Sequence, residues 1–123
     1  MLVNCVSCIT FGYSNILKTE WKAGRLPSVK YGLYGDRLTK KNVSLEHLKA
    51  KSKGGKSCLS NYALASKNNN SRRGNRDIKE YLTLDMIKKY FKQFVNTKTK
   101  GGFNGNEYIR IVTNTLRNLG FDL

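Results

Sequence analysis

Hydrophobic positions recur three or four residues apart in the C-terminal part of the chain, which is the spacing of amphipathic helices. One such segment covers residues 84–94, and Thr83 directly before it is a suitable N-cap. The spacing returns at residues 109–119, and Gly120 follows as a stop. We therefore predict two helices here that pack on each other and on the rest of the core.

The N-terminal half has shorter patterns. Residues 14–22 predict a short helix that begins at Ser14 and ends at Gly24. Residues 29–47 predict a β-hairpin, formed by an aromatic, glycine-containing arm at 31–35, a polar turn, and a strand at 43–47. The alternation in residues 1–13 is loose and fits either a strand or a packed arm.

The segment between the predicted hairpin and the C-terminal helices is polar and irregular. Residues 48–60 have no periodicity, which predicts a long exposed loop around Ser52-Lys53-Gly54-Gly55. A short helix is then predicted from Asn68 to Arg73, with Gly74 at its end. The resulting fold class is α+β. We expect a single domain over 1–123, with an N-terminal arm and helix (1–28), a central core (29–77) and a C-terminal helical extension (78–123).

The net charge of +15 on 123 residues is the compositional feature that says most about the partner of this protein. So strong a positive field on a small domain calls for a polyanionic partner, and nucleic acid is the default choice. A membrane-surface protein is disfavoured because no segment joins a basic face to a long apolar one. The start of the sequence shows no basic leader, and three cysteines do not make a paired disulfide framework. We expect a cytoplasmic protein.

Glu46 and His47 are the candidate catalytic pair. His47 is the only histidine, and Glu46 is the only acidic residue from Arg37 to Arg76, a window with eleven lysines and arginines. A carboxylate can hold a divalent cation, and an imidazole can take a proton from water near neutral pH. The pair therefore suits hydrolysis of a phosphodiester. Neighbours on a strand point to opposite faces, so both can serve one site only where the strand ends or bulges.

Cys5 and Cys8 have the two-residue gap of a zinc knuckle, but a second Cys-x-x-Cys pair is missing, since the third cysteine, Cys58, lies far downstream in the sequence. A buried or free thiol pair is the preferred interpretation, with zinc binding as the alternative.

Four separated elements resemble the motif of the HNH endonucleases. They are Leu45-Glu46-His47-Leu48, Ser52-Lys53-Gly54-Gly55, Asn61-Tyr62 and Asn70-Ser71-Arg72-Arg73-Gly74. Asn61 lies fourteen residues after His47, and Asn70 lies nine residues after Asn61. The resemblance covers roughly residues 31–77.

This resemblance implies a ββα-metal (His-Me finger) core and a nuclease of the kind found in phages and mobile elements, including homing endonucleases. Glu46 and Asn70 would be the metal ligands and His47 the general base. Asn61 would hold the loop and strand that present His47. The implied cofactor is one divalent metal ion, Mg²⁺ by preference or Mn²⁺, and the implied substrate is DNA. The residues themselves do not exclude RNA, and they leave open whether the protein is a monomer or a dimer.

The sequence departs from the family where many members carry four zinc-binding cysteines. The motif aligns those positions with Tyr31, Tyr34, Ser66 and Asn69. We therefore expect no structural zinc, with packing of the tyrosines in its place.

The cationic residues around the motif lack acidic partners, which favours phosphate contacts over a solvated surface. The candidate nucleic-acid-binding residues are Lys49, Lys51, Lys53, Lys56, Lys67, Arg72, Arg73 and Arg76. Arg72 and Arg73, on the helix that bears Asn70, are predicted to grip the scissile phosphate. The alternative to a nuclease is a non-catalytic, basic nucleic-acid-binding protein with a degenerate HNH fold.

Overall fold

The computed structural model describes residues 15–74 and 76–123 and confirms a mixture of helices and strands, the α+β class. The helices are α2 (Ile16–Lys22), α3 (Lys67–Arg73), α4 (Leu84–Lys92) and α5 (Gly105–Asn118), and the strands are β1 (Val43–His47) and β2 (Tyr62–Ser66). Short 3₁₀ turns are η1 (Lys51–Lys53), η2 (Leu59–Asn61) and η3 (Ile78–Glu80). The predictions for the arm at 1–13, for Ser14, and for Cys5 and Cys8 lie outside the described residues.

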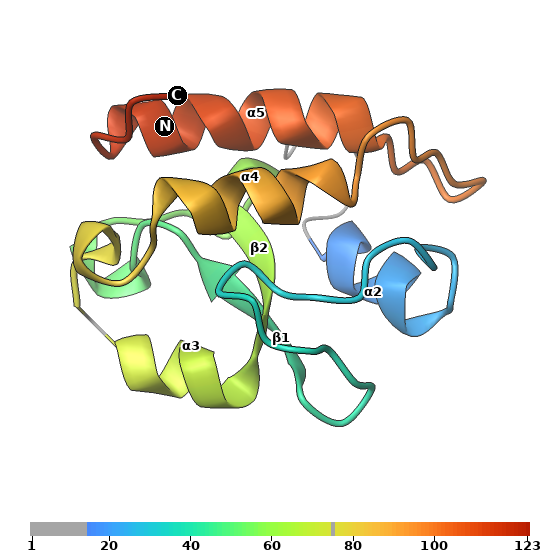
Figure 1. Cartoon of the computed structure of the whole chain (residues 1–123), viewed down its shortest axis with the longest axis horizontal. Helices are drawn as coiled ribbons and strands as arrows, with labels where there is room; N and C mark the ends of the chain where they lie inside the picture. Colours follow the sequence, from blue (N-terminus) through green and yellow to red (C-terminus); the bar gives the residue numbers. More distant parts are fainter. Residues whose placement is uncertain (1–14, 75) are drawn as a thin grey trace.

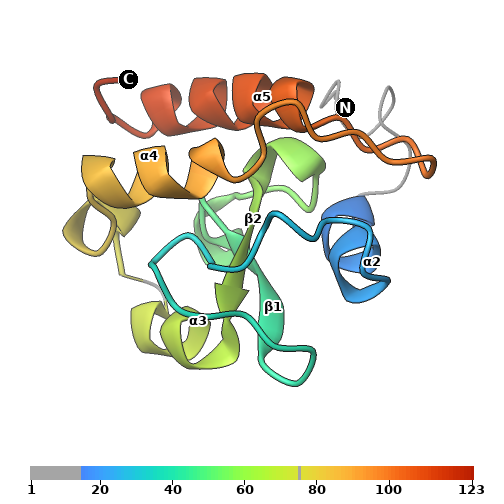
Figure 2. The same cartoon turned by 45° about the vertical axis from the view of Figure 1, so that its right-hand side comes forward.

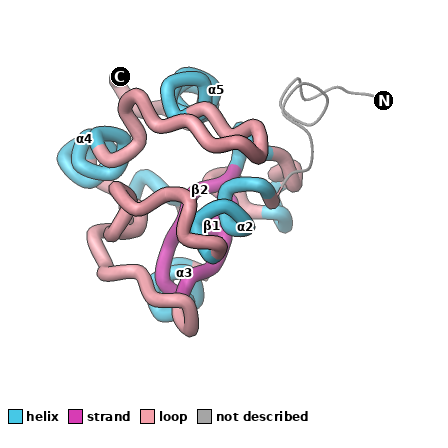
Figure 3. Tube along the Cα trace, turned by 90° about the vertical axis from the view of Figure 1, so that its right-hand side faces the viewer, coloured by secondary structure: helices cyan, strands magenta, loops and turns pink. Residues whose placement is uncertain are grey.

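The two strands form an antiparallel pair at the centre of the molecule, with Val43 opposite Ser66 and His47 opposite Tyr62. α3 follows β2 directly and packs against both strands. Figures 1 and 3 show α3 on one side of the strand pair and α4 and α5 on the other, while α2 lies beside the strands in Figure 2. Three consecutive elements, β1, β2 and α3, thus form one unit.

The predicted pairing of 31–35 with 43–47 is wrong. β1 pairs with β2, and the earlier segment contributes only an isolated bridge between Tyr31 and Arg37. Its glycines explain this, because Gly35 has a φ of +91° and the chain turns there instead of extending. The segment still contacts the sheet, since the Leu33 amide donates to the Leu64 carbonyl at 2.8 Å.

The two C-terminal helices confirm the predicted start of the first and the predicted stop of the second, but α5 begins at Gly105, earlier than predicted. The Thr83 side chain accepts a hydrogen bond from the Met86 amide, and Gly120 follows α5 with a φ of +102°. The predicted apolar spacing holds, since Ile87, Phe94, Val112 and Leu116 are buried, except that Leu84 is 40% exposed. Tyr90 and Tyr108, which the spacing did not predict, are buried as well. Among the described helices, none has the length and apolar character needed to cross a membrane.

The buried tyrosines form hydrogen bonds with backbone groups on the edge of β2 that faces away from β1. The Leu64 amide donates to the Tyr90 hydroxyl at 2.9 Å, and the Tyr108 hydroxyl donates to the Tyr62 carbonyl at 2.7 Å. The two hydroxyls are also 2.9 Å apart. An unpaired strand edge buried without such partners would cost free energy for each orphaned group, so these contacts fix α4 and α5 over the sheet.

Candidate active site

The candidate site lies where β1 ends. Glu46, His47, Asn70 and Arg73 border one cavity of about 330 Å³, together with residues 50–52 and Gly74. β1 ends at His47, so the strand geometry no longer separates the two neighbours. The structure therefore brings the two predicted metal ligands and the predicted base to the same cavity.

Glu46 is 3% exposed and is held by two partners. The Tyr34 hydroxyl donates to its Oε2 at 2.5 Å, and Arg73 Nη1 lies 3.4 Å from the same oxygen. Burial raises the pKa of the Glu46 carboxyl, while Tyr34 and Arg73 oppose that rise by favouring the charged form. The carboxylate is thus oriented from two sides before any ligand arrives.

His47 is partly buried against the Tyr62 ring, with the ring centroids 4.9 Å apart. Its Nε2 lies 3.4 Å from Ser57 Oγ. Burial lowers the pKa of His47, and the positive charges of Lys51 and Arg73 lower it further. A pKa below the usual 6.5 favours the neutral ring at pH 7, which is the form that can accept a proton.

Asn61 joins both ends of the lysine loop. Its Oδ1 accepts from the Lys49 amide at 2.8 Å, and its Nδ2 donates to the carbonyls of Lys49 and Lys56 at 3.0 and 2.9 Å. The backbone supports the same link, since the Leu48 amide donates to the Asn61 carbonyl at 2.9 Å. Asn61 does not border the cavity, so its contacts are those of a bracing residue.

The loop from Lys49 to Lys56 is exposed, as predicted, but it contains the 3₁₀ turn η1. Glycine is required at two positions of this loop, for a different reason at each. Gly54 has a φ of +89°, which favours glycine. A Cβ on Gly55 would lie 1.7 Å from the Lys49 carbonyl oxygen, so only glycine lets the two backbone segments approach.

Asn70 is fixed from the β1 side. Its Nδ2 donates to Ser44 Oγ at 2.6 Å and to the Leu45 carbonyl at 3.0 Å. The carbonyl can only accept, which sets the orientation of the amide and leaves Oδ1 unused by these bonds. One carboxylate and one amide oxygen at a cavity fit a hard cation such as Mg²⁺ or Mn²⁺, which prefers oxygen ligands and keeps several waters.

Arg73 differs from its predicted role as an exposed phosphate contact. It is 3% exposed, and its guanidinium donates to the carbonyls of His47 (2.5 Å), Leu48 (2.9 Å) and Arg76 (3.1 Å). It joins the end of β1 to the end of α3 and pairs with Glu46. The other seven predicted nucleic-acid contacts, Lys49, Lys51, Lys53, Lys56, Lys67, Arg72 and Arg76, are exposed.

A polar network includes two of the positions that align with the zinc-binding cysteines, and a third packs against it, while Tyr31 is exposed and does not take part in the expected packing. Ser66 Oγ and Asn69 Nδ2 both donate to Asp36 Oδ2, and the Tyr81 hydroxyl donates to Asn69 Oδ1 at 2.6 Å. Tyr34 packs edge-on against Tyr81 with a centroid distance of 4.8 Å. These contacts connect the 31–37 segment, β2 and α3. Whether the protein lacks zinc stays a prediction.

Sequence reasoning assigned no role at the site to Tyr34, which contacts Glu46, or to Tyr62, which contacts His47. The sequence predicted only packing for Tyr34, and Tyr62 entered only as the neighbour of Asn61 in the motif. A lone tyrosine twelve residues before Glu46 gives no signal in the sequence, because its reach depends on the turn at Gly35. Within residues 15–74 and 76–123, no three or more His, Cys, Asp or Glu side chains gather into a metal-binding cluster.

Comparisons with known proteins gave no match: no protein-family model, no curated protein and no solved structure matches the chain.

Proposed function

We propose that the protein is a metal-dependent endonuclease of the HNH type that hydrolyses phosphodiester bonds in DNA. The observation that supports this most is the convergence of Glu46, His47 and Asn70 on one cavity. The proposal takes β1, β2 and α3 as a ββα-metal core, with the cavity between the end of β1 and α3. The spacing of the sequence motif and this convergence point to the same three side chains.

In the proposed reaction, neutral His47 accepts a proton from the water molecule whose oxygen bonds to phosphorus, while the bond from phosphorus to the 3′ oxygen breaks. The departing 3′ oxygen takes a proton from solvent water. Glu46 and Asn70 would hold Mg²⁺ or Mn²⁺, which offsets negative charge on the phosphate oxygens when it is bound. Asn61 positions the loop that follows His47, and Arg73 positions Glu46 and the end of β1. The exposed lysines from Lys49 to Lys56 attract the negatively charged phosphate backbone toward the site.

The test is nicking of supercoiled plasmid by the wild-type protein in Mg²⁺, in Mn²⁺ and in EDTA, beside His47→Ala. Removal of a general base costs on the order of 10²–10⁴ in rate. DNA binding should be nearly unchanged, because it rests on many cations. Cleavage that persists in EDTA, or a His47→Ala variant as fast as wild type, would contradict the proposal. An RNA substrate of equal length in the same assay decides between the nucleic acids.

A non-catalytic nucleic-acid-binding protein is the second candidate. The observation that favours it is that Glu46 Oε2, a proposed metal ligand, already has Tyr34 and Arg73 as partners. A cation at Glu46 must share this carboxylate with Arg73 or displace it. Binding of DNA without nicking in either metal, and without measurable Mn²⁺ binding by calorimetry, would select this candidate.

A further inference from the structure

A second cavity, of about 480 Å³, opens between the 31–35 segment and α4. It shares no lining residue with the cavity at Glu46 and His47. We propose that it binds an unpaired nucleobase of a nucleic acid strand, with the Tyr31 ring as the stacking surface. The inference rests on the proposed function only in taking nucleic acid as the ligand, and it does not depend on cleavage.

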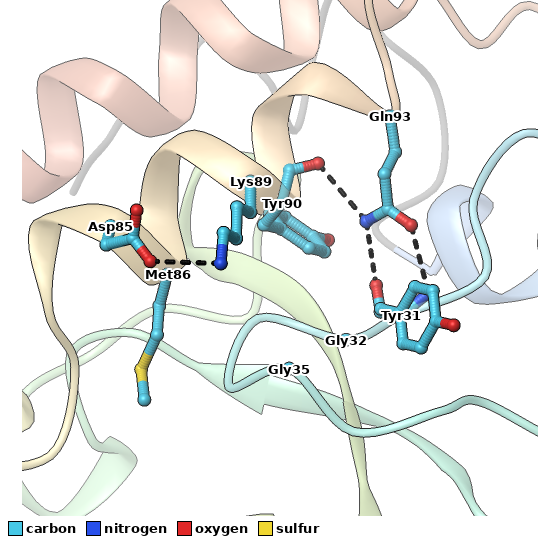
Figure 4. Close-up of a pocket in the computed structure, with 8 residues that line it drawn as sticks. All are labelled: Tyr31, Gly32, Gly35, Asp85, Met86, Lys89, Tyr90 and Gln93. Atoms are coloured by element: carbon cyan, nitrogen blue, oxygen red, sulfur yellow. Dashed lines mark hydrogen bonds and ion pairs between the residues drawn. The ribbon is translucent and has the colours of Figure 1, made fainter.

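Tyr31 combines an exposed ring with a fixed backbone. Its side chain is 46% exposed, one of three large hydrophobic side chains so exposed in the described part of the chain. Gln93 holds the backbone below it: Oε1 accepts from the amides of Lys30 and Tyr31, and Nε2 donates to the Tyr31 carbonyl, all at 2.9 Å. Figure 4 shows the bonds between Gln93 and Tyr31 at the edge of the cavity. Because the backbone of Tyr31 is already fixed, this residue loses little conformational entropy when a base binds.

The walls of the cavity suit a flat, apolar group. Gly32 and Gly35 contribute no side chain, and Met86 and Tyr90 form the wall on α4. In Figure 4, Met86 and Tyr31 lie on opposite sides of the opening. The volume falls within the roughly 300–1,000 Å³ of small-molecule sites. Aromatic stacking accepts any base, because every base has a π-face.

Charge near the cavity suits the phosphates that accompany a base. The Arg37 guanidinium lies over the Tyr31 ring, 5.7 Å from its centroid, so a cation already covers one face of the ring. A base stacks on the other face or displaces Arg37, which stays close enough to contact a phosphate. Lys89 lines the cavity and pairs with Asp85 at 3.2 Å, with both side chains at least 75% exposed. Such exposed pairs are weak, so Lys89 can turn to a phosphate at little cost. A nucleotide strand satisfies both the stacking surface and these cations.

The test uses two short single-stranded oligonucleotides in EDTA, where the proposed cleavage chemistry is off. One carries the fluorescent base 2-aminopurine, and the other has an abasic position in its place. Wild type should quench the fluorescence and bind the base-containing strand more tightly. Both strands have the same phosphates, so the ratio of the two affinities cancels the phosphate contribution to binding. That contribution is large for a protein of charge +15. In Tyr31→Ala this ratio should fall by about 5- to 150-fold, toward one.

Two variants keep the test specific. Tyr31→Phe retains the ring and should keep the ratio, and Val95→Ala removes another exposed apolar side chain and should also keep it. Thermal melts of all variants check that each is folded. A ratio unchanged in Tyr31→Ala overturns the proposal, as does a wild-type ratio of one, which would leave the cavity to a protein partner. Competition by free dAMP, compared with competition by the oligonucleotide, shows whether the base comes from a free nucleotide or a strand.

Discussion

The hydroxyl of Tyr34 donates a 2.5 Å hydrogen bond to Oε2 of Glu46, and both residues are buried. This contact connects the 31–37 segment to the end of β1, where the candidate site lies. It also means that the charge state of Glu46, and hence any cation bound there, depends on a tyrosine outside β1, β2 and α3.

Tyr34→Phe should lower the free energy of unfolding by about 1–3 kcal/mol, because Glu46 loses a hydrogen bond in a buried setting. Urea denaturation measures this, and Tyr31→Phe, at an exposed ring, is the control. The Tyr34 bond lowers the Glu46 pKa, so its loss should raise that pKa further. Mn²⁺ binding should then weaken more at pH 6 than at pH 8. Equal weakening at both pH values would contradict the assigned role.

Arg73 and Glu46 should behave as a coupled buried pair. Arg73→Met or Glu46→Gln alone should cost about 3–5 kcal/mol, because each leaves the other charge buried without its partner. The double variant should cost clearly less than the sum of the two. Lys89→Met, which breaks an exposed pair, should change stability by no more than about 0.5 kcal/mol. Additive losses in the buried pair would show that the two side chains act separately.

The single histidine allows a direct measurement of its pKa, because only His47 contributes imidazole signals to the NMR spectrum. We expect the pKa to lie below 6.5, and Lys51→Gln should raise it, because the charge of Lys51 lowers it. Lys53→Gln is the matched control. The unfolded chain binds a proton here more readily, so stability should fall as the pH drops from 6.5 through the lower, folded-state pKa. Cleavage should fall over the same acid range.

Asn61→Asp should loosen the loop after His47. The substitution keeps the acceptor for the Lys49 amide but replaces two donor bonds with a carboxylate that faces two carbonyls. We expect a loss of at least about 2 kcal/mol, since each unmade bond of a part-buried group costs about 1–3 kcal/mol. Asn114→Asp, at an exposed position of α5, is the control. If the His47 NMR signal shifts in Asn61→Asp but not in Asn114→Asp, Asn61 influences the position of His47.

Replacement of Lys49, Lys51, Lys53 and Lys56 by Gln should lower the slope of log affinity against log salt on duplex DNA by about 3–4. Sequence preference should persist, because phosphate contacts position the protein without distinguishing bases. The control removes four exposed lysines elsewhere, Lys22, Lys92, Lys98 and Lys100, with the same change in net charge. If both sets lower the slope equally, the DNA path does not follow this loop, and Arg72 and Arg76 become the next candidates.

The sequence by itself determined those features that depend on neighbours in the chain. The Thr83 cap, the glycine stop after α5 and the exposed lysine loop follow from local spacing and from residues with special backbone preferences. The motif likewise predicted which side chains to examine at the candidate site, because its spacing is a property of the chain alone.

Only the tertiary structure decided which segments pair and how the site is supported. β1 has two apolar candidates for a partner, and the turn at Gly35 together with the tyrosine hydroxyls on β2 selects Tyr62–Ser66. The burial of Arg73 could not be foreseen, since an arginine beside an exposed one looks the same in the sequence. Its four contacts arise from elements up to 27 residues apart (Glu46 to Arg73), and long-range contacts of this kind leave no periodic trace in the sequence.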